Sequence, residues 1–226
     1  VLGIGGELSL WHPWLMDWLR WMRRAAPDIA LRVEVGLPES LTHQVSTGAL
    51  DIAVMYQPRY RPGARVELLL EEKLVLVSTS ADTETARADN YVYVDWGPEF
   101  AQHHELSFPD ENNPGLFVSL GPLALSYILE VGGSGYFRQR IVAPHIAAGR
   151  LHLVADAPSF LYPIYAVCSA QADDELVSLA LAGLRNIAAS DVVNAAPVQA
   201  SNSDAPMQNE VSSIPPNRTS GLPTAE

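Results

Sequence analysis

Strand-like and helix-like segments alternate from Val1 to Ser78, and this alternation restricts the fold more than any other feature of the sequence. The expected segments are, in order, the strand Leu2–Gly5, a helix that carries Trp11 to Met22 and is closed by Pro27, the strand Ile29–Val35, the helix Glu39–Thr47, the strand Leu50–Met55 and the strand-like runs Val66–Leu70 and Lys73–Val77. This order predicts a parallel sheet with crossover helices, which places a ligand cleft at the carboxyl ends of the strands. We expect the cleft where Gly5–Ser9, Gly36–Ser40 and Met55–Pro58 converge.

An apolar stripe marks the first helix. Trp11, Leu15, Trp18 and Met22 recur at the spacing of one helical face, whereas the charged residues fall largely off it. Pro13 stands near the start of this helix, where a missing amide proton costs nothing. The pattern predicts an amphipathic helix.

The overall composition limits the possible functions. The chain has 226 residues, 48% of them apolar, which is enough for a sizeable core in one or two compact domains. Its 26 acidic and 14 basic residues give a formal charge of −12. Nucleic-acid affinity comes mainly from cationic side chains that neutralise phosphates, so the chain by itself is predicted to be a poor DNA binder.

Cys168 is the only cysteine, which excludes an internal disulfide and a metal site built from several thiolates. It follows an apolar run, Ile164–Val167, and this context favours an inert buried thiol over a nucleophile. The amino-terminal residues contain neither a basic region nor a long apolar stretch, so we expect no secretory signal and no membrane span there.

The polar stretch Ser78–Asn90 predicts a connector, after which a second α/β unit begins. The chain is then expected to return to the first unit through the strand Ile164–Ser169 and the helix Asp174–Ala188. We therefore predict a first lobe from residues 1–79 and 161–189 and a second lobe from residues 80–160. Residues 190–226 are rich in Pro, Ser, Asn and Ala without an apolar repeat, which predicts a disordered tail.

The order of these elements resembles the effector-binding domain of LysR-type transcriptional regulators. The family's Gly-x-Leu-Asp-hydrophobic-Ala-hydrophobic segment is matched by Gly48–Val54, and the proline-acid pair that ends its first helix is similar to Pro27-Asp28. In the second half, Leu123–Leu125 leading to Gly133–Gly135 resembles the family's helix and Gly-x-Gly turn. The resemblance covers about Val1 to Ala188, and its strength lies in the order and spacing of several motifs.

The resemblance implies an α/β protein with a two-lobed, type 2 periplasmic-binding-protein-like fold, in which each lobe is a sheet flanked by helices and two crossover connections join them. It implies a cytoplasmic, ligand-sensing and dimerising domain of a bacterial transcription factor, without a cofactor. The partners would be a small anionic effector and further copies of the chain, in a homodimer or tetramer. DNA would be bound only through a winged helix-turn-helix domain that would precede Val1 and is absent from this chain.

Two departures from the family pattern concern the site. The segment Tyr136–Arg140 is more polar than the usual apolar strand ending in Pro. Leu37-Pro38 stands where the family commonly has small hydroxylated residues, which removes a hydroxyl and an amide donor from one wall of the expected pocket.

Candidate effector-binding residues lie at the ends of the predicted strands and at the start of the helix Leu123–Val131. They are Ser9, Leu37, Pro38, Tyr56, Gln57, Trp96, Gly97, Phe100, Gly121 and Pro122. Ser9 lies at a strand-to-helix turn, where free amides favour an anionic or polar group, but a simple helix cap is an equal alternative. Trp96 and Phe100 are either pocket walls or core, and Gly121 is either a ligand contact or turn geometry only.

Four tryptophans within three turns of the first helix cover more than one helical face. Since the family pairs through this helix and a helix near the end, the resemblance implies a dimer interface, for which the candidates are Trp14, Trp18, Trp21, Leu176 and Leu179. The alternative is that all four tryptophans belong to the core or cover it.

Two other classes of function stay open beside the regulator. An extracytoplasmic solute-binding protein of a transporter shares the bilobal architecture, but it needs a secretory signal ahead of Val1. An enzyme on the same scaffold would need convergent catalytic groups, and no such set stands out in the sequence. Adjacent His103 and His104 with Glu105 suggest a metal site, but adjacent side chains point in different directions and no third ligand has suitable spacing.

Overall fold

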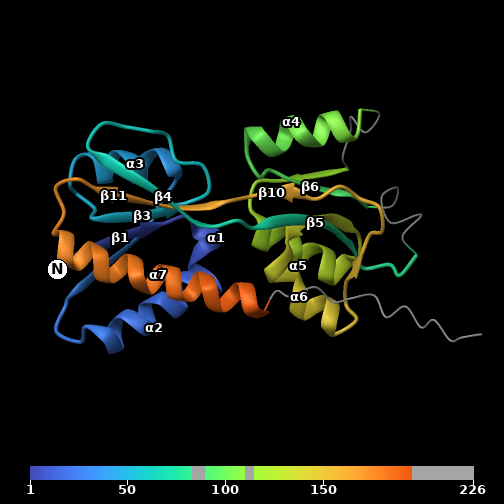
Figure 1. Cartoon of the computed structure of the whole chain (residues 1–226). Coiled ribbons are helices and arrows are strands. Elements are labelled where there is room, and N and C mark those ends of the chain that lie inside the picture. The colour runs from blue at the N-terminus through green and yellow to red at the C-terminus, as the bar shows by residue number, and fades with distance from the viewer. Residues whose placement is uncertain (83–89, 110–114, 195–226) are drawn as a thin grey trace, which may run out of the picture. The chain divides into compact units, whose positions relative to one another are not determined.

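The structure, a computed structural model, describes residues 1–82, 90–109 and 115–194, and it contains a five-stranded sheet near the amino terminus. The strand order is β2-β1-β3-β11-β4 (Figure 1). The strands are β1 (Leu2–Gly6), β2 (Leu31–Val35), β3 (Ile52–Met55), β4 (Ala64–Leu70) and β11 (Ile164–Ser169). As predicted, β1, β2 and β3 are parallel, so their carboxyl ends share one edge, whereas β11 is antiparallel to both its neighbours.

A second sheet has the order β10-β5-β8, and β9 also pairs with β5. Its strands are β5 (Lys73–Ser78), β8 (Ser134–Arg138), β9 (His152–Leu153) and β10 (Phe160–Leu161), and every pairing is antiparallel. A separate parallel pair is formed by β6 (Val92–Val94) and β7 (Leu116–Val118). The prediction of two sheet-centred halves is confirmed.

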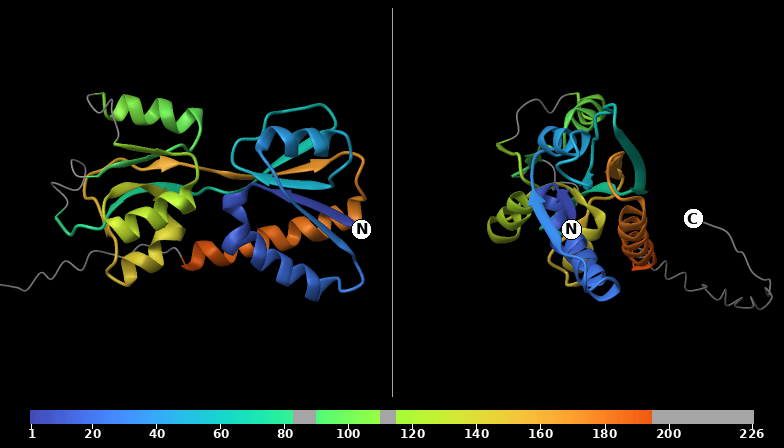
Figure 2. Two further views of the ribbon diagram at one scale, coloured as in Figure 1. Left: turned by 180° about the vertical axis from the view of Figure 1, so that it is seen from behind. Right: turned by 90° about the vertical axis from the view of Figure 1, so that its left-hand side faces the viewer.

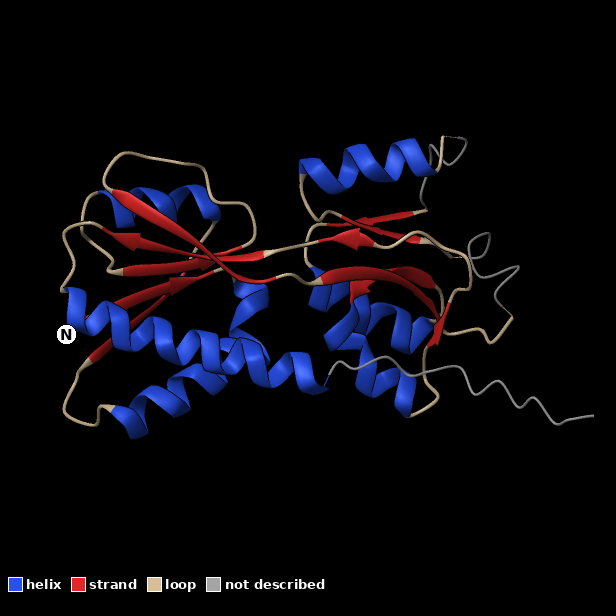
Figure 3. Cartoon of the chain, viewed as in Figure 1, coloured by secondary structure: helices blue, strands red, loops and turns tan. Residues whose placement is uncertain are grey.

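Helices flank both sheets (Figure 3). The first sheet carries α2 (Met16–Ala25) and α7 (Asp174–Asn194) side by side on one face and α3 (Pro38–Ser46) on the other (Figures 1 and 2). The helices α5 (Gly121–Val131) and α6 (Gln139–Ala147) contact strands of the second half, to which α4 (Pro98–Ser107) also belongs. None of the described helices is long and apolar enough to cross a membrane.

Two of the predicted boundaries need correction. Lys73–Ser78 was assigned to the first lobe, but β5 hydrogen-bonds only to strands of the second sheet, so the chain crosses at Glu71-Glu72 and not after Thr79. The return crossing, Tyr162-Pro163, lies between β10 and β11 as expected. The helix α7 continues through Asn194, so the predicted tail does not begin at Ser190; residues 195–226 lie outside the described part of the chain, as do residues 83–89 of the predicted connector.

The first helix is interrupted, contrary to the prediction of one continuous element. A short turn, α1 (Leu8–Leu10), leads into η1 (Trp11–Leu15), where His12 has an extended backbone, and α2 follows. Pro13 explains the break, because it lacks an amide proton and disfavours helical geometry at the residue before it. The apolar stripe is nevertheless buried as predicted, from Trp11 to Met22.

Close packing joins the two helices on the first sheet. The indole nitrogen of Trp18 donates a hydrogen bond to the backbone oxygen of Ala180 at 3.0 Å. Gly183 of α7 lies against the rings of Trp21 and Trp18, so near that a Cβ atom at Gly183 would overlap Trp21. The contact therefore requires glycine at this position.

Replacement of Gly183 by alanine tests this packing. In an open helix the change would stabilise the fold by about 1 kcal/mol, because alanine is the better helix former. Here we expect a net loss of about 1–3 kcal/mol in the free energy of unfolding, since the new methyl group forces Trp21 aside. Urea denaturation measures this change in the free energy of unfolding. Gly115→Ala is the control, because no described atom lies within 4 Å of its new Cβ. A stabilised Gly183→Ala variant would contradict the packing.

Candidate functional site

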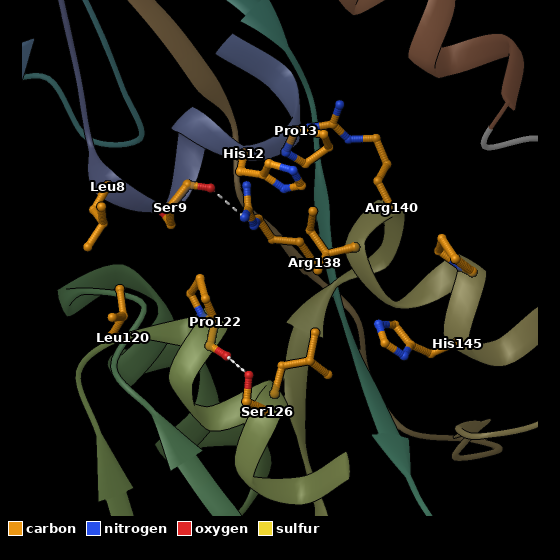
Figure 4. A pocket seen from close by; sticks show the side chains of 13 residues that line it. Leu8, Ser9, His12, Pro13, Leu120, Pro122, Ser126, Arg138, Arg140 and His145 are labelled. Carbon is orange, nitrogen blue, oxygen red and sulfur yellow. Dashed lines mark hydrogen bonds between the residues drawn. The ribbon is translucent and has the colours of Figure 1, made fainter. Parts of the chain in front are cut away.

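A cavity of about 580 Å³ lies where segments of the two halves meet. Three stretches of chain supply its walls: the α1–η1 turn after β1, the start of α5, and the end of β8 with α6 (Figure 4). The lining residues are Leu8, Ser9, His12, Pro13, Leu120, Pro122, Leu125, Ser126, Arg138, Arg140, Ile141, Pro144 and His145. The first stretch follows the carboxyl end of a parallel strand, which is where the strand order predicted a ligand cleft.

Arg138 is the most unusual side chain of this cavity. It ends β8, its residue is only 3% exposed, and its guanidinium reaches toward the first half of the chain. There it donates a hydrogen bond to the hydroxyl of Tyr56. It donates another, at 2.7 Å, to the backbone oxygen of Ser9 (Figure 4). Within the described ranges, no carboxylate oxygen lies within 4.0 Å of its nitrogens. An arginine this deeply buried is normally paired with an acid.

Glu7 interacts electrostatically with Arg138, but the two do not form an ion pair. Burial raises the pKa of the Glu7 carboxyl, and the backbone N–H of Tyr56 and the positive charge of Arg138 only partly offset that. The Tyr56 N–H donates to the Glu7 carboxylate at 2.9 Å. The carboxylate thus serves mainly to hold the chain after β3.

Tyr56 contacts Arg138 with both its hydroxyl and its ring. Its ring stacks on that of Tyr162 with centroids 4.1 Å apart, and the Arg138 guanidinium carbon lies 5.7 Å from the Tyr56 ring centroid. Burial raises the pKa of both phenols well above their ordinary value, so both hydroxyls stay neutral near pH 7. The tyrosines therefore orient Arg138 without neutralising it.

Arg140, in contrast, is fully paired. Its Nε and Nη2 atoms donate to the two carboxylate oxygens of Glu72 at 3.0 and 3.1 Å, and the Glu72 side chain is 1% exposed. The backbone oxygen of Glu72 also accepts a hydrogen bond from the N–H of Tyr162 at 2.7 Å. Glu72 thus links both crossing segments to the cavity wall.

His145 adds a neutral polar edge to the cavity. Its Nδ1 atom is buried and has no hydrogen-bond partner among the described residues. Burial, with a contribution from the positive charge of Arg150, lowers the pKa of this imidazole. Near pH 7 the ring is therefore uncharged.

The structure brings together only some of the predicted effector-binding residues. Ser9 and Pro122 line the cavity, and Tyr56 lies just behind it. Ser9 does not cap a helix, because it lies inside α1, whose N-cap is Glu7. Gln57 and Gly97 face each other, since a Cβ at Gly97 would lie 2.8 Å from the Gln57 side-chain oxygen, but neither lines this cavity.

The other predicted contacts lie away from the cavity. Leu37 and Pro38 form the start of α3, where Leu37 is 77% exposed. Trp96 and Phe100 are buried in the core, and the Trp96 indole donates to the backbone oxygen of Tyr136 at 2.9 Å. Gly121 lies under the Trp96 ring with no room for a Cβ, so its role is close packing at the start of α5.

The residues predicted for the dimer interface fall into a buried group and a partly exposed group. Trp14 and Trp18 are 2% and 0% exposed, so packing within the chain already uses their surface, and their assignment to an interface is corrected. Trp21, Leu176 and Leu179 keep partial exposure beside the α2–α7 contact.

Sequence reasoning missed five polar residues of the cavity, namely His12, Ser126, Arg138, Arg140 and His145. One signal was present: Tyr136–Arg140 is more polar than the strand expected there, and both arginines of that segment line the cavity. A charged residue in an otherwise apolar strand indicates a site, because burial of an arginine is costly without a partner. No comparable signal marks the histidines.

The remaining chemistry of the described residues is limited. No group of three or more His, Cys, Asp or Glu side chains among them is placed to hold a metal ion. Burial raises the pKa of the Cys168 thiol to about 11, in agreement with an inert cysteine.

Two sheets joined by paired crossings, with a cavity where their segments meet, define a ligand-binding domain of the type 2 periplasmic-binding-protein-like class. The model of the LysR substrate binding domain matches residues 1–187, and the chain belongs to this family of transcriptional regulators.

Individual relatives agree with this membership. The chain is 25% identical over 185 residues to the HTH-type transcriptional regulator HdfR of Yersinia enterocolitica, a match that covers 77% of this chain and 62% of the relative. The chain thus spans about three fifths of the length of the curated relatives it matches. Among solved structures, the regulatory domain of HypT from Salmonella typhimurium has a TM-score of 0.67 at 15% identity, covering 84% of this chain and 95% of that one.

A further solved structure, LysG from Corynebacterium glutamicum with bound effector Arg, has a TM-score of 0.63 at 15% identity over 84% of this chain and 68% of LysG. These structural likenesses show the fold.

Two bidentate ion pairs among the described residues, Glu72 with Arg140 and Glu67 with Arg185, allow a matched test of the cavity wall. Glu72→Gln removes the charge of a carboxylate that is 1% exposed and that pairs with Arg140, whose side chain is 16% exposed, so we expect the free energy of unfolding to fall by about 3–5 kcal/mol. Glu67→Gln removes a similar pair with Arg185, whose side chain is 55% exposed, and should cost at most about 1 kcal/mol. Urea denaturation of both variants measures the difference, and equal losses would show that the Glu72 pair is not structural.

Proposed function

We propose that this domain senses a small anionic effector, which binds in the cavity formed by the α1–η1 turn, the start of α5 and the β8–α6 segment. The observation that carries the proposal is Arg138, a buried guanidinium at the cavity wall with no carboxylate beside it in the described ranges. Ser9 and Pro122, predicted from the sequence as effector contacts, line the same cavity. The effector-bound LysG structure, a member of the same fold class, supports binding of a small molecule by such a domain.

Regulation would follow from the position of this cavity. An effector that contacts segments of both halves favours the arrangement in which it makes the most contacts, and it can shift the equilibrium only by that difference in affinity. In the proposed regulator the DNA is bound by a separate helix-turn-helix domain, since the charge of −12 makes this chain a poor ligand for DNA. Such a regulator would act in the cytoplasm.

Pairing of two copies would transmit the change to DNA. For the homodimer we propose the exposed parts of the α2–α7 surface, where Trp21, Leu176 and Leu179 offer apolar area. Sedimentation of wild type and Leu179→Arg should show dimers only for wild type; a dimeric variant would place the interface elsewhere.

The proposed site is tested by closing it. Ser126 is an exposed residue at the cavity wall, so Ser126→Trp should fill space there without disturbing the core. We expect the best ligand of a metabolite panel to bind this variant at least about tenfold more weakly, a loss of about 1.4 kcal/mol, by titration calorimetry. Leu106→Trp, on the exposed side of α4, is the control. Unchanged affinity in Ser126→Trp would place the ligand in another site.

A further inference from the structure

We propose that the effector is a monocarboxylate with an apolar body, and that Arg138 is the residue that binds its carboxylate. This inference rests on the proposed function, because it assigns a chemical class to the ligand of the same cavity. It follows from the charges, the remaining hydrogen-bond donors and the walls of that cavity.

The charge balance of the cavity leaves room for one anion. Among the described residues, Arg138 has no carboxylate within ion-pair distance, whereas Arg140 donates both hydrogen bonds of a bidentate pair to Glu72. A buried cation without a counter-ion is costly, and a bound carboxylate removes that cost. A dicarboxylate would bring a second negative charge that faces an arginine already neutralised.

Arg138 also keeps donors for the ligand. A guanidinium has five N–H donors in a planar fork, and two of them are used, by the Tyr56 hydroxyl and the Ser9 backbone oxygen. These two bonds fix the plane of the group in advance, and the remaining N–H groups suit the two oxygens of a carboxylate. Arg138 is therefore preorganised by the first half of the chain, although it comes from β8 of the second.

The other walls determine the rest of the ligand. Apolar side chains dominate them, among them Leu8, Leu120, Leu125, Ile141 and Pro144. None of the described lining residues is Asp or Glu, so these walls offer no partner to an ammonium or a second guanidinium. This argues against amino acids and polyamines. The few hydroxyl and imidazole groups, Ser9, Ser126, His12 and His145, are too few for a sugar, whose many hydroxyls all need partners.

The experiment compares four probes of similar size by titration calorimetry with the whole chain: benzoate, benzamide, benzylamine and succinate. Benzoate should bind at least about tenfold more tightly than the other three. In Arg138→Gln the benzoate affinity should fall by roughly ten- to a hundredfold, the range of a charge-assisted bidentate contact. Arg59→Gln is the matched control, because Arg59 pairs with Glu39 at the exposed surface and does not line the cavity.

A variant that fails to fold does not block the test. A crystal structure of the wild-type chain with 4-iodobenzoate locates the iodine by its anomalous signal, and the carboxylate should lie within hydrogen-bond distance of the Arg138 guanidinium. A carboxylate bound elsewhere would overturn the inference, as would tighter binding of benzamide or succinate, equal benzoate binding by Arg138→Gln, or no benzoate binding at 10 mM.

Failure of the inference differs from failure of the proposed function. If a compound outside the monocarboxylates binds wild type and loses affinity in Ser126→Trp, the cavity is an effector site and only the assigned class is wrong. If the ligands that bind wild type all bind Ser126→Trp equally well, the site itself is wrong.

Discussion

The burial of one guanidinium determines much of the arrangement around the cavity. Arg138 extends from the last residue of a strand in the second sheet to the Tyr56 hydroxyl and the Ser9 backbone oxygen, both beyond the strand ends of the first sheet. Burial of a positive charge here is unfavourable, and the surrounding groups lower its energy by hydrogen bonds to neutral acceptors, by the face of a tyrosine ring and by the charge of Glu7, which does not form an ion pair with it. The break of the first helix around His12 also shapes the cavity. It places the Ser9 backbone and the Pro13 ring at the cavity wall and not inside a regular helix.

The fold was predictable because the order of its elements is strongly patterned. The stripe from Trp11 to Met22 and the segment Gly48–Val54 mark a helix and a strand whose places in the structure agree with the prediction. The division between halves was less accurate, since Val66–Leu70 and Lys73–Val77 resemble two adjacent strands of one sheet, and nothing local shows that Glu71-Glu72 carries the chain to another. The helical break was missed because the apolar stripe continues across Pro13, and α7 was ended too early because the change of composition after Ala189 was taken as the start of the tail.

The site was predicted less completely than the fold. Ser9 and Pro122 were found because they lie at element ends, which sequence order locates well. Trp96 and Gly121 also lie at element ends, but the ring of one packs on the bare Cα of the other, and only a three-dimensional arrangement shows that this contact closes the core. Arg138 and Arg140 differ by two positions and look alike in sequence. Their difference in charge balance depends on Glu72, some seventy residues earlier, so no local pattern could have separated them.

The two crossing segments connect the cavity arginines to the link between the two sheets. Glu72 in one crossing and Tyr162 in the other are joined by a backbone hydrogen bond, and each supports one cavity arginine: Glu72 pairs with Arg140, and Tyr162 stacks on the Tyr56 ring that holds Arg138. If one sheet moves relative to the other, the backbone of these crossings has to change, because they are the chain's covalent links between the halves in the described ranges. An anion bound at Arg138 would act on the hydrogen bond to Tyr56, and hence on the stack with Tyr162. This contiguous set of contacts is the physical requirement for coupling between a bound anion and the orientation of the sheets. Its strength depends on how differently the anion binds the two orientations.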